Sequence, residues 1–113
     1  MTRTIWHYTC DHGAPGIRSG GVVVPNHHPL LGVELSWFTD LERSHRHEAG
    51  LTSARIACDR MAHRFAVADP AGLIWWPRAA RVLAVPRAVR DELEEGRLLA
   101  HWWVAFGPVE VIT

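Results

Sequence analysis

Short runs of aromatic and β-branched residues, each bounded by glycine, proline or polar residues, predict several short strands. The first run covers residues 4–9 and passes directly into a polar cluster that begins at Cys10. Because side chains alternate along a strand, they form two sets: Ile5, His7 and Thr9 on one face, Trp6, Tyr8 and Cys10 on the other. The strand therefore places His7 and Thr9 on one face near its C-terminal end.

The segment after this strand predicts a short helix and a second strand. Asp11 is placed to cap a helix over residues 12–19, and the pair Gly20-Gly21 ends it. Residues 22–24 are three valines stopped by Pro25, which is typical of a short strand. Residues 26–31 contain too many helix and strand breakers for a regular element, so we expect a loop.

The middle of the chain alternates predicted strands with turns. Strands are expected over residues 33–39, 54–58 and 63–68, and a helix capped by Thr39 or Asp40 is expected through residue 48. Residues 69–72 predict a turn in which proline sets the bend and Gly72 adopts a positive φ. The apolar run 73–76 should end at Pro77.

The last third predicts one helix and two strands. Pro86 suits a first helical position, so a helix is expected over residues 86–95, with Val89 and Leu93 packing and with Arg87, Arg90, Asp91 and Glu94 exposed. Residues 82–85 are either a strand or the lead-in to this helix, and strands over residues 101–106 and 109–112 complete a sheet. The pattern predicts a single α+β domain over residues 1–113, with two or three helices.

Composition limits the possible chemistry. The formal net charge is zero, and arginine and acidic residues are interspersed, which argues against an electrostatic nucleic-acid binder. All 12 basic residues are arginine, so Schiff-base chemistry and a P-loop are excluded. The bias toward arginine, alanine, glycine, proline and valine is typical of a GC-rich genome, such as that of an actinobacterium or its phage.

Cysteine content and hydropathy indicate a cytoplasmic protein. The 2 cysteines, Cys10 and Cys58, can form at most one bridge and cannot build a disulfide framework. Only two apolar residues lie between Arg3 and His7, so no signal peptide is expected, and no apolar run approaches the roughly 20 residues of a membrane helix. We therefore expect reduced thiols and no membrane partner.

The order of these features resembles the ADP-ribosyltransferase family. The resemblance is carried by His7-Tyr8-Thr9 ending the first strand, the short helix closed by Gly20-Gly21, and Ser36-Trp37-Phe38-Thr39 ending a strand about thirty residues later. Small bacterial members, including rifampicin-modifying enzymes and DNA-modifying toxins, share a similar His-x-Thr and a later aromatic-aromatic-Thr. The likeness covers roughly residues 5–49, and the chain is also similar to short actinobacterial and phage proteins.

This resemblance implies a split sheet, antiparallel or mixed, that holds NAD as a substrate, with ADP-ribose transferred to a protein or nucleic-acid acceptor. His7 is implied to bind the ribose on the nicotinamide side, and Trp37 or Phe38 to stack on nicotinamide. The implied cofactor-binding set is His7, Tyr8, Thr9, Trp37, Phe38 and Thr39. The family's acidic residue lies on a late strand, where Glu110 is the candidate, so His7 and Glu110 form the implied catalytic pair. A hydrogen-bonded core histidine and a solvent-facing strand glutamate are the structural alternatives.

Two other classes of function remain open. Cys10, His12, Cys58 and His63 offer two sulfur and two imidazole donors, a set that suits tetrahedral zinc, although their spacing matches no common zinc motif and we expect no metal. A binding or inhibitor module without chemistry, which would be a degenerate transferase-like fold acting on a host protein or a nucleotide, is favoured if Trp75, Trp76, Trp102 or Trp103 form an exposed patch. Burial of these tryptophans in a core is the alternative.

Overall fold

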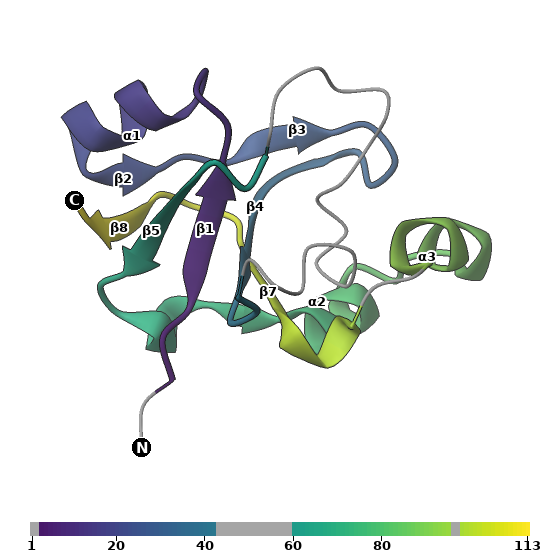
Figure 1. Cartoon of the computed structure of the whole chain (residues 1–113). Helices are drawn as coiled ribbons and strands as arrows, with labels where there is room; N and C mark the ends of the chain where they lie inside the picture. Colours follow the sequence, from purple (N-terminus) through teal and green to yellow (C-terminus); the bar gives the residue numbers. More distant parts are fainter. Residues whose placement is uncertain (1–2, 43–59, 96–97) are drawn as a thin grey trace.

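The computed structural model describes residues 3–42, 60–95 and 98–113, which form an antiparallel sheet with short helices (Figure 1). The strands are β1 (Trp6–Thr9), β2 (Val22–Val23), β3 (Asn26–His28), β4 (Val33–Thr39), β5 (His63–Val67), β6 (Ile74–Trp75), β7 (Trp102–Ala105) and β8 (Val109–Ile112). The helices are α1 (Ala14–Gly20), α2 (Trp76–Val82) and α3 (Arg87–Glu94), with 3-10 turns at Pro70–Gly72 and Leu99–His101. The α+β class is thereby confirmed.

The strands run in the order β2-β8-β5-β1-β4-β7-β6, with β3 pairing on β4 off this path. β1 pairs with β5 over its four residues, from Trp6↔Ala66 to Thr9↔His63. Its ladder to β4 is limited to Trp6↔Thr39. The central strands β1 and β4 are therefore joined at one end only, and β4 is held mainly by β7 and β3.

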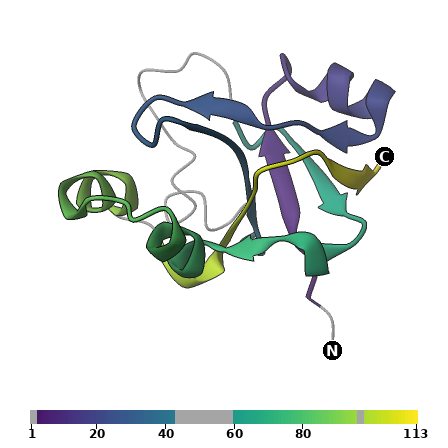
Figure 2. The ribbon, with the colours of Figure 1, turned by 180° about the vertical axis from the view of Figure 1, so that it is seen from behind.

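The two faces of the sheet carry separate cores, as the alternation along β1 predicts. The Tyr8 face packs Tyr8, Leu35, Trp102 and Val104 against Trp76, Ala79 and Ala80 of α2. The opposite face, here called the His7 face, packs Ile5, Phe38, Phe65, Val67 and Val111 against Ala14 of α1 and Val23 of β2. Figures 1 and 2 show α1 and α2 at opposite ends of the molecule, so neither helix covers the whole sheet.

Helix α1 begins and ends for different local reasons. The predicted Asp11 cap is wrong: Gly13 occupies the N-cap, no side chain caps the helix, and proline sits in the first turn. The predicted glycine stop is confirmed, because Gly21 adopts a φ of 71° and its N–H bonds to the Ile17 carbonyl. Glycine is the residue that adopts this left-handed conformation without steric cost.

Three local predictions are wrong, the first because strand pairing overrides local preference. Residues 26–28 form strand β3 and not a loop, since they pair with β4 from Asn26↔Leu35 to His28↔Val33. Pro77 lies in the first turn of α2 and starts a helix where the sequence predicted a stop. Asp69 caps a 3-10 turn by accepting from Ala71 N, and positive φ is found at Gly21 and Gly32 but not at Gly72.

Helix α3 matches its prediction in position but not in its exposed face. Leu93 is buried as expected, whereas Glu94 is largely covered, because its carboxylate accepts a 2.9 Å hydrogen bond from the indole N–H of buried Trp76. Residues 82–85 form no strand. The helix predicted from Thr39 or Asp40 through residue 48 lies outside the described residues from residue 43 onward. The strand predicted over residues 54–58 lies wholly outside them.

The tryptophans divide between core and surface. Trp76 and Trp102 are buried, whereas Trp75 leaves 44% of its surface exposed and Trp103 is half-buried. Within the described ranges, the helices do not have the length and apolar character that a membrane span requires.

Candidate functional site

A cavity of about 330 Å³ opens on the His7 face between β1, α1 and the segment over residues 22–26. His7 and Thr9 of β1 line it together, as the alternation along this strand predicts. The opposite wall is formed by Gly13, Gly16 and Ile17 with the valines of β2. Its lining carries no charged side chain, so it suits an uncharged, hydroxyl-bearing group next to apolar surface.

His7 fills the space where β1 and β4 are no longer paired. Its Nδ1 lies 2.8 Å from the Trp37 carbonyl oxygen, and because a carbonyl only accepts, Nδ1 carries the proton. The ring packs against Phe38 with centroids 5.5 Å apart. Burial lowers the pKa of His7 below its ordinary 6.5, although the bond to Trp37 acts in the opposite direction. His7 is therefore neutral at pH 7, and Nε2 is a hydrogen-bond acceptor.

Two glycines shape the wall opposite β1. A Cβ added at Gly13 would lie 2.3 Å from Thr9 Oγ1, so the absence of a side chain there gives the Thr9 hydroxyl its position. At Gly16 an added Cβ would meet nothing within 4 Å. Gly13, Gly16 and Ile17 share one face of the helix, since residues three and four apart lie on the same side. Gly16 therefore lines the cavity at a position where an added side chain would meet no neighbouring atom.

Three of the predicted cofactor-binding residues lie on the Tyr8 face, away from this cavity. The Tyr8 hydroxyl donates to the Leu41 carbonyl at 2.8 Å, and the Thr39 hydroxyl donates to the His101 carbonyl at 2.7 Å. Trp37 packs against Trp76 with ring centroids 4.9 Å apart. The structure uses all three in packing and hydrogen bonding.

Phe38 lies on the His7 face but offers no free surface for stacking. It has 0% exposure and belongs to the core of that face. Its role in the site is to support the His7 ring. The structure therefore brings together His7, Thr9 and, beneath them, Phe38.

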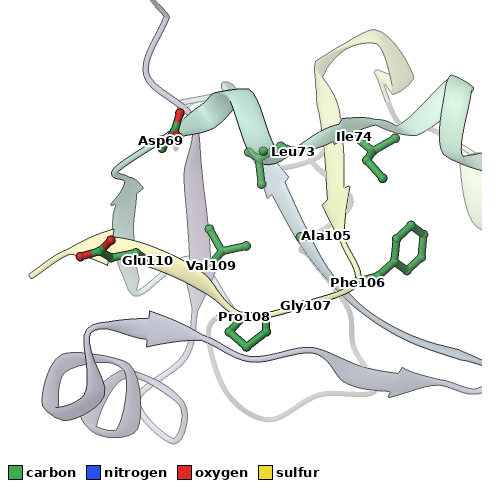
Figure 3. A pocket seen from close by; sticks show the side chains of 10 residues that line it. Asp69, Leu73, Ile74, Ala105, Phe106, Gly107, Pro108, Val109 and Glu110 are labelled. Carbon is green, nitrogen blue, oxygen red and sulfur yellow. The ribbon is translucent and has the colours of Figure 1, made fainter.

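Glu110 lies on the opposite side of the sheet from His7. The registers Trp6↔Ala66 and Ala66↔Ile112 place Ile112, and thus Glu110 two residues before it, on the face of Trp6. Figure 3 shows Glu110 at the rim of a different cavity of about 310 Å³, with its carboxylate directed away from Ala105 and Phe106. The structure does not join Glu110 to His7 in one site.

The predicted zinc ligands are only partly described. Cys10 Sγ lies 3.6 Å from His12 Nδ1, and Cys58 falls outside the described residues. Both nitrogens of His63 have protein partners: Nδ1 accepts from Arg18 at 3.3 Å, and Nε2 donates to Asp11 at 2.6 Å. In the part of the chain that the structure describes, no three His, Cys, Asp or Glu side chains are grouped to hold a metal ion.

Ser36 is a polar residue of this region that the sequence prediction did not include in the site. Alternation along β4 puts it on the face of Phe38, and it is 4% exposed. Among the described residues its Oγ has no hydrogen-bond partner. A small polar residue between apolar neighbours in a strand was the available signal, because such a hydroxyl needs a partner when it is buried.

Comparison of the chain with models of known families, with curated proteins and with solved structures found no match. The function is therefore argued from the geometry of the cavity and from the resemblance of its motifs.

Proposed function

We propose that the cavity on the His7 face binds the ribose and nicotinamide half of NAD. The observation that carries the proposal is that His7 lines the cavity while its Nδ1–H is held by the Trp37 carbonyl, which leaves Nε2 as the acceptor of the ring. A ribose hydroxyl is a donor of the kind that this nitrogen needs. The proposal also agrees with the role that the family resemblance implies for a His-x-Thr motif.

The rest of the lining supports the same ligand. Thr9 adds a hydroxyl beside His7, and Ile17 adds apolar surface for the ring. Because no charged side chain lines the cavity, the pyrophosphate of NAD would stay at its mouth.

The reaction that such a complex would serve is transfer of ADP-ribose to an acceptor. Cleavage of the bond between nicotinamide and ribose develops positive charge on the ribose, and because no charged side chain lines the cavity, the proposal assigns the protein's contribution to positioning of the ribose. Glu110 faces away from His7, so the proposal gives it no part in this step. We expect Glu110→Gln to leave both NAD binding and nicotinamide release unchanged.

Thermal unfolding with and without NAD tests the binding step. A ligand of the folded state stabilises it by about 2.7 kcal/mol at a hundredfold excess over its Kd. We expect Gly16→Leu to abolish this effect, because Gly16 lines the cavity, no atom lies within 4 Å of an added Cβ, and a leucine side chain at the wall would occupy space that the ligand needs. The unliganded melting temperature should not fall, since leucine favours a helix more than glycine does. Ser19→Leu, at an exposed position of the same helix, is the matched control and should respond to NAD like wild type.

The catalytic step is tested by measuring the release of nicotinamide from NAD by chromatography. His7→Asn keeps an amide N–H near the position of Nδ1 but has no equivalent of Nε2, so it should lose NAD-dependent stabilisation and release. An unchanged response of Gly16→Leu to NAD would refute the location of the site. Wild-type protein without stabilisation by NAD and without nicotinamide release would refute the proposed function.

A further inference from the structure

We propose a second ligand site, for a small molecule that carries a planar aromatic ring and one anionic group. The site is a cavity of about 500 Å³ between the edge strand β6 and helix α2. Its walls include Trp75, Trp103 and Phe106, with Arg78 and Val82 from α2. This site does not depend on the His7 cavity binding a nucleotide.

The aromatic walls belong to one row of side chains across the sheet. Trp75 and Trp103 lie on the His7 face, because His7 pairs with Phe65, Phe38 pairs with Trp103, and Trp103 pairs with Trp75. The pair Trp6↔Thr39 puts Phe38, one residue before Thr39, on the same face as His7. Neighbouring strands lie about 4.8 Å apart, so Trp75 is about 14 Å from His7. The two cavities therefore share a face of the sheet without overlapping.

Trp75 is exposed and Trp103 is half-buried, and both rings have a partner that holds them in place. Trp75 is 44% exposed, yet its indole N–H donates to the Ala100 carbonyl at 2.9 Å. The ring of Trp103 is flanked by the Arg3 guanidinium, 5.7 Å from its centroid. Phe106, 41% exposed, lies between this cavity and the one beside Glu110 (Figure 3). Fixed aromatic walls bind a flat ring with little loss of side-chain entropy.

Arg78 determines the charge of the ligand. It lines the cavity and, in the described part of the chain, forms no hydrogen bond or ion pair. No acidic residue lines the same cavity. A guanidinium beside apolar rings favours a carboxylate, sulfonate or phosphate on an aromatic ligand, because it supplies charge-assisted hydrogen bonds where the ring is desolvated.

The test uses 1-naphthaleneacetate and 1-naphthaleneacetamide, which share a ring system and nearly the same size but differ in charge. Binding to the full chain is measured by calorimetry and by the indole N–H signals in NMR, with Trp75→Phe identifying the Trp75 signal. We expect saturable binding of the acetate, a shift of the Trp75 signal, and at least tenfold weaker binding of the acetamide.

Arg78→Gln should bring the two affinities together, with a loss of about tenfold for the acetate. Arg81→Gln is the matched control, since Arg81 is an exposed arginine of the same helix that does not line the cavity. Val82→Glu, at a position 77% exposed, provides a second variant that places a carboxylate one turn from Arg78 and should weaken the acetate equally. Gly16→Leu should bind the acetate like wild type, which separates this site from the His7 cavity.

The proposal is overturned by any of three results: no saturable binding of the acetate to wild type, equal affinities for the acetate and the acetamide, or an Arg81→Gln loss as large as that of Arg78→Gln. Melting temperatures of the variants close to wild type establish that lost binding is not lost folding.

Discussion

His7 has a structural role as well as its proposed role in binding, and replacing it tests both. Its Nδ1–H satisfies the Trp37 carbonyl where β1 and β4 are not paired, and its ring packs on Phe38. His7→Ala removes the donor and the ring together. His7→Asn removes the ring and Nε2 but keeps an N–H donor one bond from Cγ, as in histidine. The difference between the two variants isolates the contribution of the hydrogen bond.

The expected loss of stability follows from the Trp37 carbonyl, which His7→Ala leaves without a donor. A buried acceptor without its donor costs about 1–3 kcal/mol, and we expect His7→Ala to lose about this amount plus the packing against Phe38. His7→Asn should lose about 1–3 kcal/mol less, because it also loses the ring packing but keeps a donor for the Trp37 carbonyl. Because a domain of this size has a total stability of about 5–15 kcal/mol, the difference is measurable.

Urea denaturation followed by far-UV circular dichroism at pH 7.5 gives both free energies of unfolding. For a domain of about this length, each kcal/mol corresponds to roughly 4 °C in melting temperature, which provides an independent measurement. Equal stabilities of the two variants would show that the bond from His7 to Trp37 contributes nothing to stability. That result would also refute the inference that this bond fixes the tautomer.

The same residue predicts a pH dependence. The pKa of His7 in the folded protein lies below its ordinary 6.5, because burial disfavours the charged ring. The unfolded chain therefore binds the proton first as the pH falls, so His7 contributes stability that is complete above 6.5 and is lost as the pH falls from 6.5 toward the lower folded pKa. The slope is at most about 1.36 kcal/mol per pH unit, and His7→Asn should lack it. An identical pH profile in the variant would contradict the lowered pKa.

Two further predictions concern contacts that the structure makes specific. Glu94→Ala should lower stability by about 1–3 kcal/mol in urea denaturation, because it leaves the indole N–H of buried Trp76 without an acceptor, and Glu94→Gln should avoid most of this loss, because its amide oxygen still accepts. Gly13→Ala should cost about 1–3 kcal/mol, because its Cβ would approach Thr9 Oγ1 to 2.3 Å. Adding Thr9→Ala should recover much of that loss, and a strictly additive double mutant would contradict the clash.

Local sequence patterns predicted the elements whose signals are complete within a few residues. Strand β4 is confirmed over Val33–Thr39, where aromatic and branched residues are dense. Helix α3 follows Pro86, and α1 ends at the Gly20-Gly21 pair, because proline and glycine restrict or permit particular backbone angles. The alternation along β1 also placed His7 and Thr9 on one face, and they line one cavity.

Elements that depend on a distant partner could not be predicted in this way. Residues 26–28 are polar and contain no strand signal, yet they form β3 because β4 offers them an edge. Pro77 has the same local chemistry whether it ends a strand or begins a helix. The packing of Trp76 and of Ala79 and Ala80 against the Tyr8 face determined that it begins α2.

The candidate site shows the same division. The residue types at His7, Thr9 and Glu110 are set by the sequence, but which of them meet depends on strand order and register. A shift of one residue in the pairing of β8 with β5 would exchange the faces of Glu110 and Val111, since side chains alternate with a period of two. The bond from His7 to the Trp37 carbonyl likewise exists because β1 and β4 separate after Trp6↔Thr39. The local sequence therefore determined which polar and titratable side chains are present, whereas long-range strand pairing determined which of them line one cavity.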